Sequence, residues 1–282
     1  MRPVRIFVDS TADTPSEIMN KYNISLMPLY VTLGNTTYKD VIDVNASDIF
    51  DYCEKNKTLP KTAAVSVADY LDAFGPVVNE GYDIVHFTIC SDMSSCYQNA
   101  CLAAEQLGHI RVVDSRNLSS GIGLLAIAAS EMAAAGKSSD EIFDEMTSMI
   151  PQLDVSFVLN DLNYLYKGGR CSGVAALGAN VLKLKPCIEV SGGKMGVGKK
   201  YRGSFEKCVH EYIKDRLEGK TDIDTHRMFF TYTAVDPAII ASLRKEIASY
   251  QPFEELLLAE AGSTISGHCG PCCLGILYLH KA

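Results

Sequence analysis

Hydroxyl and carboxylate side chains gather in four short segments of the first half of the chain. The segments are Asp9 to Asp13, Lys61 to Ser66, Ser91 to Ser95, and Asp114 with Ser115. Each stands at the entrance to a predicted helix, where free backbone N–H groups favour an anion. Helix capping explains Ser10, Thr11 and Ser115 equally well, but the hydroxyls around Ser94 outnumber what one cap needs. The segment around Ser94 is therefore interpreted as a binding site.

A second distinctive segment, Tyr164 to Arg170, lies in the second half of the chain. Its paired glycines, Gly168 and Gly169, permit backbone conformations that are closed to other residues, and they would hold Lys167 and Arg170 close to an approaching group. A helix end at the surface explains the same glycines equally well.

Three familiar catalytic or ligand motifs are incomplete. Gly193 to Lys199 has the spacing of a phosphate-binding loop, but Lys200 follows where Ser or Thr is required, and the segment reads as a strand. The Gly-x-Ser-x-Gly pattern of many serine hydrolases is absent. His268, Cys269 and Cys272 offer the ligand types that zinc selects, so a metal-dependent regulator is an alternative, although Cys272 and Cys273 fit core packing better.

The strands and helices that must position these residues differ in order and spacing between the two halves of the chain. Strands and helices alternate in the first half, which is typical of βαβ units on a parallel sheet. Strands are predicted at Val4–Asp9, Ser25–Leu33, Asp83–Ile89, Ile110–Asp114, Val155–Leu159, Lys183–Val190, Met195–Tyr201, Met228–Thr233, Leu256–Ala259 and Leu274–His280. Helices are predicted near Pro15–Asn20, Ser47–Lys55, Val67–Glu80, Tyr97–Leu107, Leu118–Ala135, from Ser139 to before Pro151, Ser204–Leu217 and Pro237–Ser249.

In the second half, the intervals between predicted strands and helices are longer. The turn Ser191-Gly192-Gly193 suggests a hairpin with antiparallel pairing. The sequence thus predicts an α/β protein with an N-terminal parallel-sheet domain over residues 1–153 and a C-terminal domain with a mixed or antiparallel sheet over residues 154–282.

Composition excludes several classes of protein. The 282 residues carry a net charge of −8, which disfavours a general nucleic-acid binder, and 47% of them are hydrophobic, which excludes intrinsic disorder. The N-terminus lacks the apolar run of a signal peptide, and the longest apolar stretch, Gly270 to Leu279, is about half of a membrane span. We therefore expect a cytoplasmic protein whose ten cysteines are mostly reduced.

Positive charge is concentrated in one part of this acidic chain. Asp161 to Tyr212 contains nine basic and four acidic residues, a local charge of +5. This segment is suited to docking an anionic partner surface or holding an acyl phosphate, and a merely solvated basic face is an equal alternative.

Seven segments, in this order and at these intervals, resemble the DegV family, which comprises bacterial fatty-acid-binding proteins and includes the acyl-carrying subunit of fatty acid kinase. They are Asp9 to Asp13, Thr62 to Ser66, Ser91 to Ala100, Asp114-Ser115, Tyr164 to Arg170, Leu182 to Pro186 and His268 to Pro271. The resemblance runs from about Val4 to Leu279, one unit over nearly the whole chain. Departures occur at Ala64-Val65, Ser95-Cys96 and Cys272, where the family has Gln-Pro, Gly-Thr and a glycine.

The resemblance implies that one long-chain, palmitate-like fatty acid is buried in a tunnel between the two domains. By position it assigns the carboxylate to Thr62 and Ser94, and the additional candidates for head-group contact are His268, Arg170, Ser66, Ser91 and Gly169. It implies no catalytic residue, metal or cofactor. The protein is expected to be a non-catalytic carrier that presents the acid to a separate fatty acid kinase and afterwards carries the acyl phosphate, a phospholipid precursor.

An enzymatic alternative uses two of the same residues. Ser94 would be the nucleophile and His268 its base in an acyl transferase or hydrolase. No third group that would orient His268 is evident in the sequence.

Overall fold

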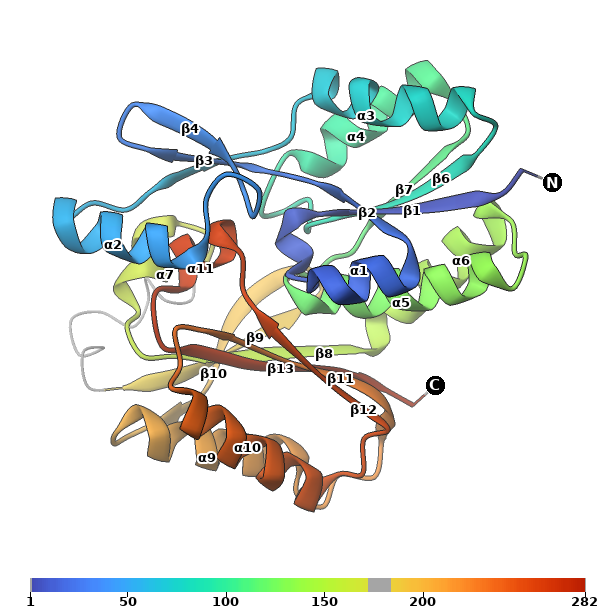
Figure 1. Cartoon of the computed structure of the whole chain (residues 1–282). Coiled ribbons are helices and arrows are strands. Elements are labelled where there is room, and N and C mark those ends of the chain that lie inside the picture. Colours follow the sequence, from blue (N-terminus) through green and yellow to red (C-terminus); the bar gives the residue numbers. More distant parts are fainter. Residues whose placement is uncertain (1, 172–183, 282) are drawn as a thin grey trace.

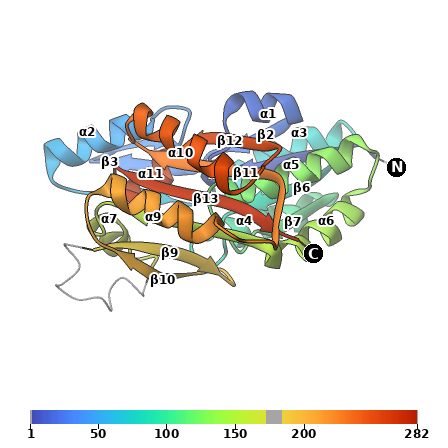
Figure 2. The same cartoon turned by 90° about the horizontal axis from the view of Figure 1, so that it is seen from below.

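The computed structural model describes residues 2–171 and 184–281, and its layers alternate between helices and sheets (Figure 1). Helices α3 and α4 cover the outer face of a parallel sheet, and α1, α5 and α6 fill the space between that sheet and a second, larger one. Helices α9 and α10 cover the outer face of the larger sheet, as the view from below also shows (Figure 2). The α/β class and the two kinds of sheet predicted from the sequence are confirmed.

The parallel sheet has four strands in the order β2-β1-β6-β7. Their bounds are Ile24–Met27 for β2, Val4–Asp9 for β1, Asp83–Thr88 for β6 and Ile110–Asp114 for β7. Neighbouring strands are all parallel, so their carboxyl ends meet at one edge. Open parallel sheets bind ligands at that edge, and Asp9, Ser91 and Asp114 lie there.

A small antiparallel sheet, in the order β4-β3-β5, corrects two sequence-based expectations. Its strands are β3 (Tyr30–Leu33), β4 (Thr36–Lys39) and β5 (Lys61–Ala63). The predicted strand Ser25–Leu33 is two strands in different sheets, because Pro28 lies between them and has no N–H for a ladder. The Lys61 to Ser66 segment, predicted as a polar segment at the entrance to a helix, begins with a strand that was not predicted, β5.

The larger sheet has six strands in the order β10-β9-β8-β13-β11-β12. Their bounds are Lys194–Tyr201 for β10, Lys185–Ser191 for β9, Leu153–Leu159 for β8, Cys273–His280 for β13, Ile223–Thr233 for β11 and Glu255–Glu260 for β12. All pairs are antiparallel except β11 with β12. The predicted hairpin joins β9 to β10, and its turn residues Gly192 and Gly193 both have positive φ, which tight hairpin turns demand.

That hairpin also decides how the glycine-rich motif beside it is interpreted. Gly193 to Lys199 runs from the hairpin turn into β10 and does not join a strand to a helix, so it lacks the context of a phosphate-binding loop. The first residues of the Leu182 to Pro186 motif and of the predicted strand Lys183–Val190 lie outside the described residues.

The helices agree with most of the predicted ones, and two short helices were not predicted. The bounds are Ser16–Tyr22 for α1, Ala46–Asn56 for α2, Val67–Asn79 for α3, Cys96–Leu107 for α4, Ser120–Ala134 for α5, Ser139–Met149 for α6, Asn163–Gly168 for α7, Phe205–Leu217 for α9, Pro237–Tyr250 for α10 and Ser263–Cys269 for α11. Single turns of 3-10 helix occur at Ser10–Ala12 and Ile150–Gln152. The unpredicted helices are α7 and α11, which are too short for a periodic apolar pattern. In the described part of the chain, no helix is both long and apolar enough to cross a membrane.

One buried apolar cluster continues from the parallel sheet through α5 into the larger sheet. Helix α5 is buried on nearly all sides, and its small residues Gly121 and Gly123 let it approach the larger sheet closely. A Cβ at Gly121 would lie 2.9 Å from Val155 of β8. Because this cluster crosses residues 153 and 154, a division of the chain into two domains at that point stays a prediction.

Two sets of polar contacts fasten the second half of the chain to the first. The buried carboxyl groups of Asp13 and Asp40 accept the backbone N–H groups of Gly262 (2.8 Å) and Thr264 (3.2 Å) at the start of α11. On the other side, Arg116 donates to the carbonyl of Gly192 at 2.5 Å in the β9–β10 turn. Together these contacts fix α11 and the hairpin against the edge of the parallel sheet.

Candidate functional site

A cavity of about 250 Å³ lies between the carboxyl edge of the parallel sheet and α11. Its polar lining is Thr62, Ser94, Ser95, Arg170, Thr264 and His268, and its other lining residues are Leu29, Ala63, Ala64, Ile89, Met93, Leu118, Phe157, Leu165, Met195, Ile265 and Cys269. No Asp or Glu is among the described residues that line this cavity. Four of the predicted site residues thus meet in one place: Thr62, Ser94, Arg170 and His268.

Thr62 and His268 form a hydrogen bond across the two halves of the chain. Thr62 Oγ1 and His268 Nε2 are 3.0 Å apart, although 206 positions separate the residues. Helix α11, which ends at Cys269, packs against β3 of the small sheet, whose neighbour β5 carries Thr62. The contact therefore depends on the small sheet that the sequence did not predict.

The other ring nitrogen of His268 is buried without a hydrogen-bond partner within the described residues. Nδ1 faces the backbone of Gly168 so closely that a Cβ there would lie 2.4 Å from it. Burial, and to a lesser degree the positive charge of Arg170, lowers the pKa of His268 to about 4. His268 is therefore a neutral imidazole at neutral pH.

This neutrality gives a first prediction. In an NMR titration of the ligand-free protein, the His268 ring signals are expected to keep their neutral chemical shifts down to about pH 5, because protonation must occur in a dry site beside Arg170. A transition of the His268 ring signals near pH 6.5, the ordinary pKa for a histidine, would contradict the geometry.

Ser94 lies on the loop between β6 and α4, at the edge where ligands of parallel sheets bind. Its Oγ accepts the backbone N–H of Cys96 at 3.3 Å and donates to the thiol of Cys96 at 3.2 Å. Sulfur is a weak acceptor, so the hydroxyl proton is available for a stronger partner in the cavity.

Arg170 supplies the positive charge of the lining. It follows the C-terminal end of α7, and its Nη1 donates to the carbonyl of Gly168 at 2.8 Å. Gly169 ends α7 with a φ of 72° and is not among the lining residues. The paired glycines thus serve a helix end and also bring Arg170 to the cavity, so the two interpretations of this segment are compatible.

Two further candidates have their hydroxyls engaged outside the cavity. Ser66 caps α3 and forms a reciprocal capping box with Asp69. Ser91 donates to Asp114 at 2.6 Å. Neither is among the lining residues, so the structure does not bring Ser66 or Ser91 to the other candidates.

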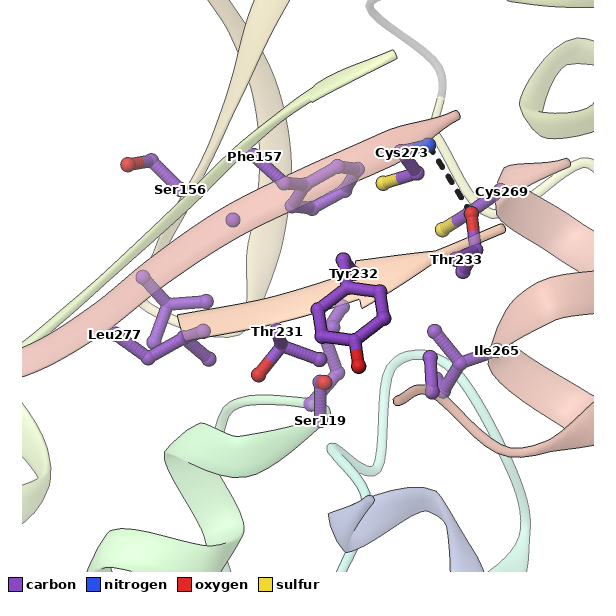
Figure 3. Close-up of a pocket in the computed structure, with 14 residues that line it drawn as sticks. Ser119, Ser156, Phe157, Thr231, Tyr232, Thr233, Ile265, Cys269, Cys273 and Leu277 are labelled. Atoms are coloured by element: carbon purple, nitrogen blue, oxygen red, sulfur yellow. Dashed lines mark hydrogen bonds between the residues drawn. The ribbon is translucent and has the colours of Figure 1, made fainter. Parts of the chain in front are cut away.

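A smaller apolar cavity, of about 30 Å³, adjoins the larger one, and Figure 3 shows the residues that line the smaller cavity. Leu118, Phe157, Ile265 and Cys269 line both cavities. The smaller one continues between α5 and the inner face of the larger sheet, and it is further lined by Ser119, Val155, Ser156, Thr231, Tyr232, Thr233, Ala261, Cys273, Gly275 and Leu277. An elongated molecule with one polar end would fit, because the larger cavity has a partly polar lining and the adjoining smaller cavity has an apolar one.

The smaller cavity is apolar although several of its residues carry hydroxyl groups. Ser119 donates to Asp13, Thr233 donates to the carbonyl of Gly270 at 2.6 Å, and Ser156 is hydrogen-bonded to Tyr212 at 2.9 Å on the other side of the sheet. In Figure 3 the hydroxyl of Ser156 points away from the ring of Phe157. Thr231 is hydrogen-bonded to Ser120 at 2.6 Å, so the groups left facing the cavity are mostly carbon and sulfur.

Sequence reasoning missed most of the apolar lining. Phe157, Ile265 and Gly275 look like ordinary core residues, and no periodicity distinguishes a side chain that lines a cavity from one that fills a core. Gly275 carried the clearest signal, because an isolated glycine in a strand often marks a close approach. A Cβ there would lie 2.7 Å from the carbonyl oxygen of Ser156.

The rival chemistries find little support in this geometry. His268 pairs with Thr62, whereas the hydrogen bonds of Ser94 go to Cys96. In the part of the chain that the structure describes, no three His, Cys, Asp or Glu side chains converge as they would around a metal ion. The zinc alternative at His268, Cys269 and Cys272 therefore has no support among those residues.

Comparison with known proteins covers nearly the whole chain. Residues 3–281 match the model of the family described as "Uncharacterised protein, DegV family". A DegV domain-containing protein of Clostridium acetobutylicum is 30% identical over 285 residues, with 100% of both chains covered.

Two solved structures extend this likeness to the fold. A structure titled as fatty acid binding of a DegV family protein from Thermus thermophilus has a TM-score of 0.89, 29% identity and 100% coverage of both chains. A stearic-acid-binding protein from Eubacterium ventriosum has a TM-score of 0.86, 26% identity, and coverage of 99% of this chain and 98% of that one.

Proposed function

Since the chain belongs to the DegV family, we propose that it binds one long-chain fatty acid, with the carboxylate in the larger cavity and the acyl chain directed into the smaller one. The observation that carries this proposal is the change of surface along the two adjoining cavities. Among the described residues, hydroxyls, a neutral imidazole and a guanidinium line one end without a carboxylate, and apolar groups line the other.

The polar end suits an ionised carboxylate. Thr62 and Ser94 supply hydroxyl donors, and Arg170 supplies a positive charge. Hydrogen bonds to a charged acceptor are stronger than those between neutral groups, so these donors would orient the ligand and distinguish an acid from an alcohol. His268 holds Thr62 in place as well as lining the cavity.

The apolar end supplies the affinity. Enclosing about 14 methylenes at ~0.8 kcal/mol each gives on the order of 11 kcal/mol of gross stabilisation. Ordering and association cost at least ~4 kcal/mol, which leaves at most about 7 kcal/mol from the acyl chain, a Kd on the order of 10 μM before the head-group hydrogen bonds add to it. The enclosed volume in the ligand-free structure is small for a chain of this length, so side chains such as Met93 and Met195 must shift as the acyl chain enters.

Native mass spectrometry tests the binding directly. Protein purified from bacteria is expected to carry an added mass that matches a fatty acid, and delipidated protein should regain such a mass when palmitate is added. Protein that is empty as purified and also ignores palmitate would overturn the proposal.

A second prediction concerns Ser94. Ser94→Ala is expected to weaken palmitate binding about tenfold, because a charge-assisted hydrogen bond is lost, and to weaken hexadecanol binding less. Ser91→Ala is the matched control, since Ser91 is on the same loop and its hydroxyl bonds Asp114 outside the cavity. Equal losses for acid and alcohol in Ser94→Ala would place Ser94 away from the carboxylate.

The same proposal includes a role as a carrier for a separate fatty acid kinase. Support comes from Arg170, which lines the cavity, and from the local charge of +5 in the segment around it, Asp161 to Tyr212. A positive segment of this kind favours an anionic partner surface and an acyl phosphate. Incubating the loaded protein with a bacterial fatty acid kinase and ATP should yield acyl phosphate, whereas the loaded protein with ATP alone should yield none.

A further inference from the structure

A buried carboxylate outside the cavity fixes both ends of the loop that carries Ser94. Asp9 stands at the end of β1 and is fully buried. Its Oδ2 accepts the backbone N–H of Ile89, where the loop begins, at 3.0 Å. Its Oδ1 accepts the hydroxyl of Tyr70 at 2.9 Å, and that hydroxyl lies against the thiol of Cys96, where α4 begins.

A chain of contacts links Ser94 to Asp9 through Cys96 and Tyr70. Tyr70 donates its proton to Asp9, so the Tyr70 oxygen can accept from either of two groups that face it, the thiol of Cys96 and Nε2 of His86, which lies 3.4 Å away. The sulfur then accepts the hydroxyl of Ser94 at 3.2 Å. Burial, followed by the negative charge of Asp9, raises the pKa of Cys96 to about 12, so the thiol keeps its proton.

The thiol also lies at the meeting point of the two head-group segments. The backbone N–H of Val65 points to the Cys96 thiol, and Asn99, one turn further along α4, donates to the carbonyl of Val65 at 2.7 Å. Val65 follows Thr62 by three residues. Cys96 and Asn99 thus join the Thr62 segment to the Ser94 segment.

We propose that Cys96 is a positioning residue for the head group, a role that rests on the proposed function. The backbone N–H of Cys96 holds Ser94 Oγ in place, and its thiol gives the Ser94 proton a weak resting partner in the ligand-free state. When a carboxylate arrives, the proton turns from sulfur to the carboxylate at little cost, while the oxygen stays where it is. Asp9 and Tyr70 keep Cys96 itself fixed.

A double-mutant cycle separates this role from a general effect on the fold. In Cys96→Ala the backbone N–H still holds Ser94 Oγ, but the hydroxyl proton loses its partner and would sample three staggered positions about the Cβ–Oγ bond, so palmitate binding should weaken about threefold. In the Ser94→Ala background the same substitution should have no effect, because Cys96 acts through Ser94. Cys96→Ser restores a polar partner and should return binding to the native value. Cys101→Ala, a half-buried thiol on the same helix, is the control and should change neither background.

Two results would overturn the proposal. One is an equal effect of Cys96→Ala with and without Ser94, and the other is no effect in either background. If Cys96→Ala does not fold, Tyr70→Phe replaces it, since losing the Tyr70 hydroxyl leaves the thiol without its acceptor and should weaken binding only when Ser94 is present. Failure of the native protein to bind palmitate would instead count against the proposed function.

Discussion

Replacing Gly168 with alanine is expected to weaken palmitate binding by about tenfold or more while the chain still folds. The new Cβ would lie 2.4 Å from Nδ1 of His268, which is far inside van der Waals contact. Gly168 is the last residue of α7 and does not have a positive φ, so alanine suits the backbone itself. The buried imidazole must therefore move, which breaks its 3.0 Å contact with Thr62. Losing one oriented hydrogen-bond donor corresponds to roughly this change in affinity.

Gly169→Ala is the matched control for this substitution. Nothing lies within 4 Å of a Cβ at Gly169, but its φ of 72° strains any other residue. That variant should lose about 1 kcal/mol of folding stability and keep its affinity for palmitate. Titration of both delipidated proteins, together with denaturant unfolding, measures the two effects separately. Native affinity in Gly168→Ala would show that His268 does not hold Thr62 for the ligand.

Raising the pH from 5 to 9 is expected to lower the free energy of unfolding by up to about 4 kcal/mol, and Asp13→Asn should remove most of that dependence. Burial raises the pKa of Asp13 from 3.8 to about 8, against the opposing hydrogen bonds from Ser119 and Gly262, and nearby Asp40 adds to the rise. The unfolded chain ionises above pH 4, whereas the folded chain stays protonated until about pH 8. Stability is therefore full at low pH and declines across that interval.

The measurement is denaturant unfolding at several pH values. The side-chain amide introduced by Asp13→Asn would keep an acceptor for Gly262 and offer an N–H donor to Ser119, so the variant should fold with a flatter stability profile. Asp51→Asn, which removes an exposed carboxylate on α2, controls for net charge and should retain the native slope. Parallel slopes in the native protein and Asp13→Asn would show that Asp13 is not the group responsible.

Local signals in the sequence predicted the regular elements well. The β-branched runs of β1, β6 and β7 gave the parallel sheet, and Gly192-Gly193 gave the hairpin. The split at Pro28 was also readable, because proline cannot take part in a central ladder, although the predicted strand ran through it. The capping box of Ser66 with Asp69 was similarly visible as Ser three residues before an acid.

The site itself depends on contacts that no local signal carries. The DegV resemblance brought Thr62, Ser94, His268 and Arg170 forward, and the structure places all four at one cavity. The pairing of Thr62 with His268 spans 206 positions and needs a small sheet whose strands are three or four residues long. The role of Asp9 behind Ser94 is likewise invisible in the sequence, since a buried carboxylate after a strand looks the same as one that faces a ligand.

The contacts that fasten the second half of the chain to the first lie on both sides of the cavity. Asp13 and Asp40 hold the start of α11 on one side, and Arg116 holds the β9–β10 turn on the other. With both attachments in place, we expect the relative orientation of the two halves to be the same before and after a ligand enters. The backbone around the cavity would then be preorganised, and binding would cost little backbone entropy even though side chains such as Met93 and Met195 shift.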